Sequence, residues 1–204
     1  MSNNLPDDLR EAKITRNTNE TQIELALNLD GSGRYDIVLP QTAGLPFLQH
    51  MLEQWAKHGG FDLAISANGD VQIDAHHLVE DIGIVLGQTL QQAVGDKRGI
   101  ARYGFFIAPM DEVLMLCAVD FCGRSWLEIN WNLEQERVGD YDVALTQEFL
   151  VALANNARMN LHLKEFSGGN AHHVIEASFK AMAKAMRAAL TVSGNELPST
   201  KGLL

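Results

Sequence analysis

Two short stretches of this sequence are nearly alike, and they lie almost half a chain apart. Residues 76–82 read HHLVEDI and residues 172–178 read HHVIEAS, in a chain of 204 residues. The expected elements follow the same order around both stretches: strands, a helix, further strands, and a helix that begins with two histidines. The sequence therefore predicts an internal duplication, with one repeat over residues 1–95 and a second over residues 96–204.

The spacing of apolar residues and the positions of glycines indicate where the elements lie. Helices are expected from residue 45 to the glycines at 59 and 60, and over about 76–93, 144–158 and 172–190. Strands are expected over 61–66, 71–73, 105–108, 113–121, 126–131 and 161–165, while 14–29 is interpreted as a strand that runs into a turn and forms a hairpin. Asn68-Gly69 is expected to be the turn between 61–66 and 71–73. The predicted fold class is α+β, an internally duplicated two-layer sandwich in which each half is a mostly antiparallel sheet packed by helices, forming one compact unit.

Charge and cysteine content exclude several classes of protein. The chain has 16 Lys and Arg residues and 26 Asp and Glu residues, which gives a net charge of −10. Electrostatic binding of nucleic acid or anionic lipid over a broad surface is therefore not expected. No apolar run reaches the roughly 18 uncharged residues of a membrane helix, and the N-terminus lacks the regions of a signal or transit peptide. Cys117 and Cys122 form no CxxC motif. These features predict a cytoplasmic protein.

The repeated motif has the spacing of metal ligands on a helix. His76 and Glu80 stand four residues apart, as do His172 and Glu176, so each pair shares one helix face. One copy alone would fit a solvated helix start equally well, because the helix dipole favours a Glu there. A second copy in the equivalent place favours metal binding. The HExxH order of zinc proteases is absent.

The second histidine of each pair points about 100° away from the first on a helix of ~3.6 residues per turn. A two-fold arrangement solves this geometry, because each His–Glu pair can be completed by the second histidine of the other motif. The expected sets are His76, Glu80 and His173 for one ion, and His172, Glu176 and His77 for the other. Imidazole and carboxylate ligands with open positions suit Mn²⁺, Fe²⁺, Co²⁺ or Zn²⁺.

Longer segments identify the chain as a member of the imidazoleglycerol-phosphate dehydratase family. They are FLQHMLEQWAKHGGFDL (47–63), HHLVEDIGIVLGQ (76–88), GDKRGIARYG (95–104), PMDE (109–112), NAHHVIEASFKA (170–181) and PSTKG (198–202). The resemblance covers nearly the whole chain. It implies halves with the ribosomal protein S5 domain 2-like fold, a homo-oligomer of twenty-four subunits built from trimers, and two Mn²⁺ ions per active site at subunit interfaces.

The resemblance also adds one ligand to each ion. It implies that His50 joins His76, Glu80 and His173, and that Glu148 joins His77, His172 and Glu176. Taken from the residues alone, His50 fits a buried histidine and Glu148 fits a surface charge. Many relatives have a histidine in place of Glu148.

The implied reaction converts D-erythro-imidazoleglycerol phosphate to imidazole acetol phosphate in histidine biosynthesis, through an imidazolate-like intermediate bound to two manganese ions. Glu20 is expected to be the base, with metal-bound water or the ligand carboxylates Glu80 and Glu176 as alternatives. The residues expected to contact this phosphorylated imidazole substrate are Glu20, Gln49, His50, Glu53, Arg102, Arg124, Lys180, Ser199 and Lys201.

Five positions depart from the commonest residues of the family without removing an expected ligand: Gln49, Glu53, Ala75, Leu78 and Gly169. Two other functions fit the repeated motifs. One is a different di-metal reaction on a phosphorylated small molecule, such as hydrolysis. The other is a metal-assembled structural shell without catalysis, in which the ions only join subunits.

Overall fold

The computed structural model describes residues 10–204, and they form two halves with the same order of elements. The first half contains β1 (Glu11–Asn17), β2 (Thr21–Asn28), β3 (Tyr35–Val38), α1 (Leu45–Gly59), β4 (Asp62–Gly69) and α2 (His76–Val94). The second contains β5 (Tyr103–Met110), β6 (Val113–Asp120), β7 (Trp126–Asn130), α3 (Ala144–Ala157), β10 (Asn160–Ser167) and α4 (Ala171–Ala189). A small pair, β8 (Arg137–Val138) and β9 (Tyr141–Asp142), precedes α3.

The two sheets have equivalent strand orders. The first is β1-β2-β4-β3 and the second is β5-β6-β10-β7. In each sheet the pair that flanks the first helix of its half is parallel, β3 with β4 and β7 with β10, and the other pairs are antiparallel. The predicted duplication and the mostly antiparallel sheets are therefore confirmed.

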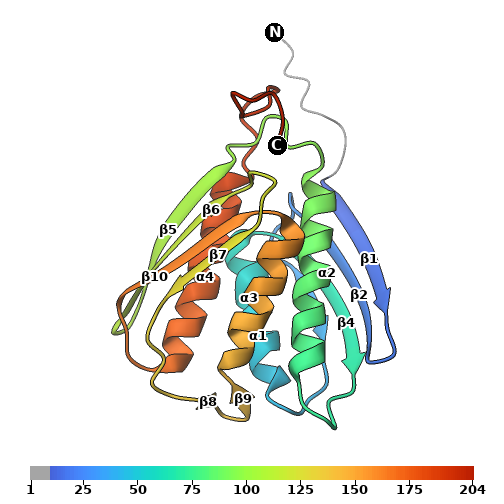
Figure 1. Cartoon of the computed structure of the whole chain (residues 1–204), viewed down its shortest axis with the longest axis vertical. Coiled ribbons are helices and arrows are strands. Elements are labelled where there is room, and N and C mark those ends of the chain that lie inside the picture. The colour runs from blue at the N-terminus through green and yellow to red at the C-terminus, as the bar shows by residue number, and fades with distance from the viewer. Residues whose placement is uncertain (1–9) are drawn as a thin grey trace.

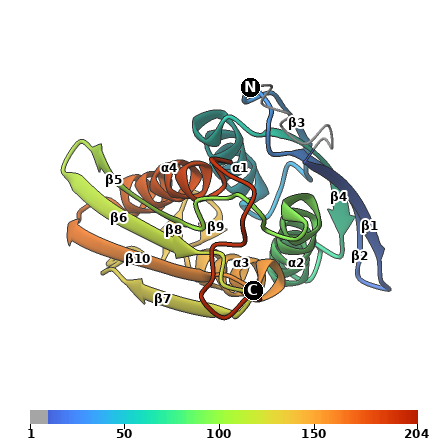
Figure 2. The ribbon, with the colours of Figure 1, turned by 90° about the horizontal axis from the view of Figure 1, so that it is seen from above.

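The four helices lie between the two sheets (Figure 2). Helix α2 packs on β1 and β2 of its own half and on α3 of the other half, while α4 packs on β5, β6 and α1. Two glycines let α2 approach α3 closely: a Cβ on Gly83 would lie 2.6 Å from the Phe149 carbonyl oxygen, and one on Gly87 would lie 2.7 Å from that of Leu153. The halves thus share one core.

The segment 14–29 holds two strands where the sequence suggested one. Residues 18–20 form the turn between β1 and β2, and the Thr18 hydroxyl accepts hydrogen bonds from the backbone N–H groups of Glu20 (3.1 Å) and Thr21 (2.9 Å). A threonine hydroxyl at this position replaces the glycine signal that usually marks a hairpin. The expected hairpin exists, but its turn lies earlier than the glycine-rich segment at 31–33.

The predicted hairpin about Asn68-Gly69 is wrong. Both residues belong to β4, where they pair with Gln22 and Thr21, and no strand forms over 71–73 within the described chain. Pairing with β2 outweighs the local turn preference of the Asn-Gly sequence. The next residue, Asp70, donates its backbone N–H to the Glu20 carbonyl, so the start of α2 lies beside the β1–β2 turn.

The four predicted helices and the strands expected over 105–108, 113–121, 126–131 and 161–165 are confirmed. Helices α2 and α4 both begin at the lower end of the molecule and end at the upper end (Figure 1). The HHxxE motifs therefore open both helices at the lower end. The segment after α4 crosses the upper end, where the Gly99 N–H donates to the Glu196 carbonyl (2.9 Å).

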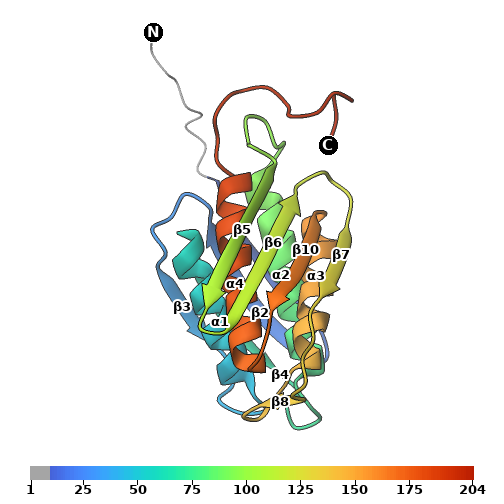
Figure 3. The same cartoon turned by 90° about the vertical axis from the view of Figure 1, so that its left-hand side faces the viewer.

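The second sheet faces the viewer in Figure 3, with β5 at one edge and β7 at the other. No helix of residues 10–204 has the length and apolar character needed to cross a membrane.

Candidate active site

The two HHxxE motifs have matching geometry. In the first, the rings of His76 and His77 have centroids 6.2 Å apart at 86° to one another. In the second, the rings of His172 and His173 are 5.9 Å apart at 81°. Neighbouring histidines therefore point in different directions at both helix starts, as the helical period predicts. Asn170 caps α4 by accepting the His172 N–H (2.9 Å).

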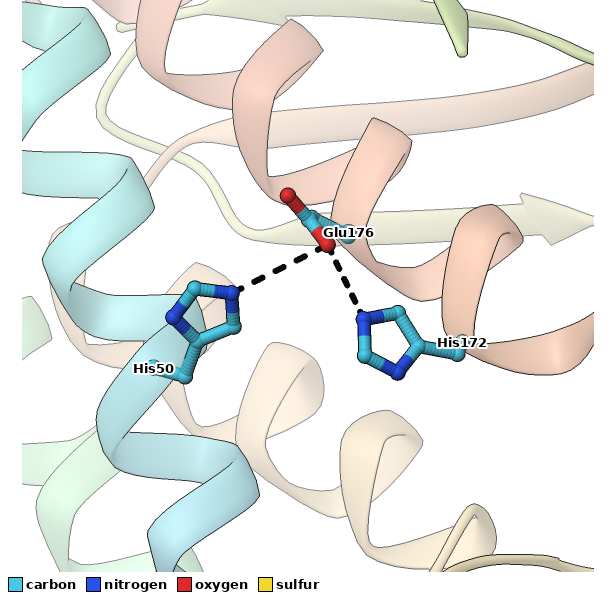
Figure 4. A group of neighbouring side chains, drawn as sticks. All are labelled: His50, His172 and Glu176. Carbon is cyan, nitrogen blue, oxygen red and sulfur yellow. Dashed lines mark hydrogen bonds and ion pairs between the residues drawn. The ribbon is translucent and has the colours of Figure 1, made fainter. Parts of the chain in front are cut away.

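Three side chains from α1 and α4 form the first group of potential metal ligands (Figure 4). Glu176 Oε2 lies 3.0 Å from His172 Nε2 and 3.8 Å from His50 Nε2. Its other oxygen is 2.7 Å from Lys180 Nζ. Burial opposes ionisation of Glu176, but Lys180 and His172 outweigh it and hold its pKa below the usual value. The group thus offers two imidazole nitrogens and an ionised carboxylate.

The surroundings of His50 differ from the interpretation based on the residues alone. Its side chain is 43% exposed, so the interpretation of a buried histidine is wrong. The structure brings it beside His172 and Glu176, whereas the resemblance groups it with the ligands of the other ion. On α1, Glu53 lies 3.8 Å from His50 Nδ1 and accepts a hydrogen bond from Gln49 (3.1 Å). Gln49 and Glu53, both expected substrate contacts, therefore lie beside His50 at the lower end of the molecule.

A second group joins Glu20, Asp70 and His77. Asp70 Oδ2 lies 2.9 Å from His77 Nδ1, and this hydrogen bond raises the pKa of His77. The other oxygen of Asp70 is buried without a hydrogen-bond partner among residues 10–204. A carboxylate on Nδ1 orients the ring and leaves Nε2 free as a ligand. The sequence analysis did not single out Asp70, although it follows the Asn68-Gly69 pair.

A third group joins Asp111, Glu112 and His173. Glu112, in the turn between β5 and β6, accepts the backbone N–H of Asn170 (2.9 Å) and lies 3.0 Å from His173 Nδ1. The Asn170 N–H is the main cause that lowers the pKa of Glu112 to about 2. Glu112 therefore holds His173 as Asp70 holds His77. Glu112 is the last residue of the PMDE segment, but its contact with His173 is visible only in the structure.

Three expected ligands fall outside these groups. Among residues 10–204, no such group includes His76, Glu80 or Glu148. Glu80 is exposed on α2 and Glu148 is half-buried on α3. Their assignment stays a prediction.

A cleft of about 500 Å³ lies at the upper end, and it contains the other four expected substrate contacts: Arg102, Arg124, Ser199 and Lys201. Arg102 donates to both oxygens of Asp120 (2.7 and 3.1 Å) and to the Pro198 carbonyl (2.9 Å). Arg124 and Lys201 are exposed. A cationic cleft in a chain of net charge −10 suits a phosphate group.

The HHxxE motifs and this cationic cleft lie at opposite ends of the same chain. The Arg102 N–H donates to the carbonyl of Ala189 in the last turn of α4, while His172 lies in the first turn. At ~1.5 Å per residue, about 26 Å of helix separates them. A small substrate cannot span that distance. A site that uses both ends must take them from different copies of the chain.

Comparison with known proteins identifies the family. Residues 43–186 match the family model described as imidazoleglycerol-phosphate dehydratase. The chain belongs to the imidazoleglycerol-phosphate dehydratase family. A member from Bordetella pertussis is 51% identical over 199 residues, covering 96% of this chain and 100% of that protein. One from Thermosynechococcus vestitus is 46% identical over 207 residues, covering 100% of this chain and 97% of that protein.

Solved structures of dehydratases in this family have the same fold. The enzyme from Staphylococcus aureus is 39% identical, with a TM-score of 0.79, over 90% of this chain and 99% of that one. The enzyme from Pyrococcus furiosus is 35% identical, also with a TM-score of 0.79, over 94% of this chain and 100% of that one. The chain is therefore an enzyme of the hydro-lyase class, an imidazoleglycerol-phosphate dehydratase of histidine biosynthesis.

Proposed function

We propose that the dehydratase converts D-erythro-imidazoleglycerol phosphate to imidazole acetol phosphate with two Mn²⁺ ions in each active site. The observation that carries this proposal is the equivalence of the two HHxxE motifs at the lower ends of α2 and α4. For each motif, a carboxylate in a turn outside the motif lies within hydrogen-bond distance of Nδ1 of the second histidine. These carboxylates are Asp70 for His77 and Glu112 for His173. Such outer carboxylates typically accompany histidines that bind a metal.

The donor set fits a divalent transition ion. His172 Nε2 and Glu176 Oε2 lie 3.0 Å apart and offer a nitrogen and an oxygen to one ion. His50 Nε2, 3.8 Å from the same oxygen, offers a nitrogen to the other ion. We assign His50, His76, Glu80 and His173 to one ion, and His77, Glu148, His172 and Glu176 to the other. Bound Mn²⁺ would supply Lewis-acid stabilisation of negative charge on the substrate's imidazole.

Glu20 is positioned to move a proton. It is exposed at the tip of the β1–β2 hairpin, and its backbone carbonyl accepts the N–H of Asp70, which holds His77. We assign Glu20 as the base that takes the C–H proton, because it reaches the ligand group and remains open to a substrate. Loss of the hydroxyl one carbon away completes the elimination of water.

Arg102, Arg124, Ser199 and Lys201 would bind the phosphate in the cationic cleft. Because this cleft lies about 26 Å along α4 from His172, we propose that the active site forms between copies in a homo-oligomer. The outer face of the second sheet supports such an assembly. Phe105 and Ile107 are 71% and 42% exposed there. They pair with the apolar residues Ala118 and Leu116 of β6.

The first test is turnover by the purified enzyme before metal removal, after stripping, and after Mn²⁺ is restored, with particle size recorded each time. We expect both turnover and assembly to be lost and recovered. Glu20→Gln and Arg124→Ala should reduce turnover while particle size stays unchanged. Unchanged turnover in both variants would favour a structural shell. Release of inorganic phosphate from the substrate would instead favour a hydrolase.

A further inference from the structure

One lysine beside the cationic cleft has no partner in the fold. Lys97, in the loop after α2, is only 7% exposed, and it makes no side-chain hydrogen bond or ion pair with any residue between 10 and 204. Burial lowers its pKa. Trp55 Nε1 and Asp70 Oδ1 are the buried side-chain polar atoms of residues 10–204 that lack a partner, and Lys97 Nζ is not one of them, so the ammonium reaches the surface while the rest of the side chain is buried. An ammonium at the surface that is not paired within the fold can bind an anion.

The Lys97 ammonium lies against the wall of the cleft. Its Nζ is 3.5 Å from the position that a Cβ on Gly123 would occupy, and Gly123 lines the cleft. The same position lies 2.7 Å from the carboxyl carbon of Leu204, so the last residue of the tail, which also lines the cleft, lies beside the ammonium at this point. The charged or titratable groups that act on Lys97 are Cys122, Arg158, Asp120 and Arg102, and all but Asp120 line the cleft.

The charge balance of the cleft favours an anion near Lys97. Asp120 already neutralises Arg102 through two hydrogen bonds. Arg124 and Lys201 are exposed, so water screens their charges. Lys97 is only 7% exposed as a residue, so water screens its charge less than it screens those of Arg124 and Lys201.

We propose that Lys97 is a further phosphate-binding residue, whose ammonium donates a hydrogen bond to the substrate's phosphate beside Gly123. This inference rests on the proposed function, since the phosphate is that of the dehydratase substrate. Lys97 contributes affinity and takes no part in proton transfer, because its ammonium lies beside the cleft proposed to hold the phosphate, a group that does not react.

The test compares Lys97→Met with Lys13→Met, which removes an exposed lysine from the outer face of the first sheet. We expect Lys97→Met to raise KM and the inhibition constant of inorganic phosphate by about tenfold or more, with kcat changed by less than about threefold. Its Tm without phosphate should be unchanged, since the ammonium makes no hydrogen bond or ion pair with any residue between 10 and 204 and methionine keeps an unbranched apolar chain in the buried part of the site. Lys13→Met should leave all three quantities unchanged.

Inorganic phosphate should also raise the Tm of the wild-type enzyme and of Lys13→Met, but much less that of Lys97→Met. An unchanged inhibition constant and an unchanged Tm rise in Lys97→Met would overturn the proposal. A lower Tm without phosphate, with unchanged phosphate affinity, would show a purely structural role. If the wild-type enzyme did not turn over its substrate, the proposed function would fail, and the phosphate-dependent Tm would still decide the role of Lys97.

Discussion

Asp81 joins the hairpin that carries Glu20 to helix α2, and its removal should destabilise the enzyme measurably. Asp81 as a whole residue is 6% exposed. Its carboxylate accepts hydrogen bonds from Arg16 Nε (3.0 Å) and from the buried Thr21 hydroxyl. In Asp81→Ala, Thr21 loses a charged acceptor inside the protein. Arg16 loses its ion pair but regains water, because its side chain is 36% exposed.

The magnitude follows from these two contacts. The buried hydrogen bond to a charged group contributes about 1.5 kcal/mol, and the half-exposed contact with Arg16 about 1 kcal/mol. We therefore expect Asp81→Ala to lower the free energy of unfolding by about 2–3 kcal/mol. For a chain of this length, that loss corresponds to a fall in Tm of about 4–12 °C.

Urea unfolding followed by circular dichroism, at fixed protein concentration, measures the loss. Glu24→Ala is the control, on the strand β2 that also carries Thr21. The ion pair of Glu24 with Lys13 is more than half exposed on both sides and should cost less than about 0.5 kcal/mol to remove. Equal losses in the two variants would refute the reasoning that burial makes the Asp81 contacts strong.

Three further predictions concern packing, thiol chemistry and pH. Gly87→Ala should cost about 1–3 kcal/mol in urea unfolding, because its Cβ would lie 2.7 Å from the Leu153 carbonyl oxygen; an unchanged midpoint would contradict the close α2–α3 contact. Cys117, fully buried with a raised pKa, should react with thiol reagents only as the protein unfolds, and labelling of the native enzyme would be inconsistent with this. Asp62 has a pKa below its usual value, mainly through its hydrogen bond from Arg34, so its ionised form stabilises the fold above about pH 4 and loses this effect as pH falls through the lowered pKa. The Tm difference between wild type and Asp62→Asn should therefore shrink from pH 7 to pH 3, and a constant difference would argue against it.

Helical periodicity predicted more of this fold than local turn signals did. The four helices follow from apolar spacing and glycine stops, and the repeated motif revealed the duplication. Strand β3 has only four residues and depends on parallel pairing with β4, a contact between segments far apart in sequence. The Asn68-Gly69 pair is a strong local signal, yet pairing with β2 kept both residues in a strand.

In the candidate site too, the features set by the helical period could be predicted from the sequence, and those set by tertiary contacts could not. The different directions of neighbouring histidines follow from the helical period alone. The carboxylates that hold them, Asp70 and Glu112, come from separate turns whose positions depend on the tertiary fold. The burial of Lys97 likewise depends on how the chain folds around the cleft, and no sequence pattern indicates it.

The most direct test of the account is whether two inactive variants restore activity together. His172→Ala removes a ligand at the lower end, and Arg124→Ala removes a cation from the cleft at the upper end. If each active site takes these ends from different copies, random co-assembly of equal amounts gives about a quarter of the sites both intact groups. We therefore predict about a quarter of wild-type turnover in co-assembled particles purified through a tag on each variant. Turnover no higher than that of either variant alone would place both groups on one copy and contradict the account.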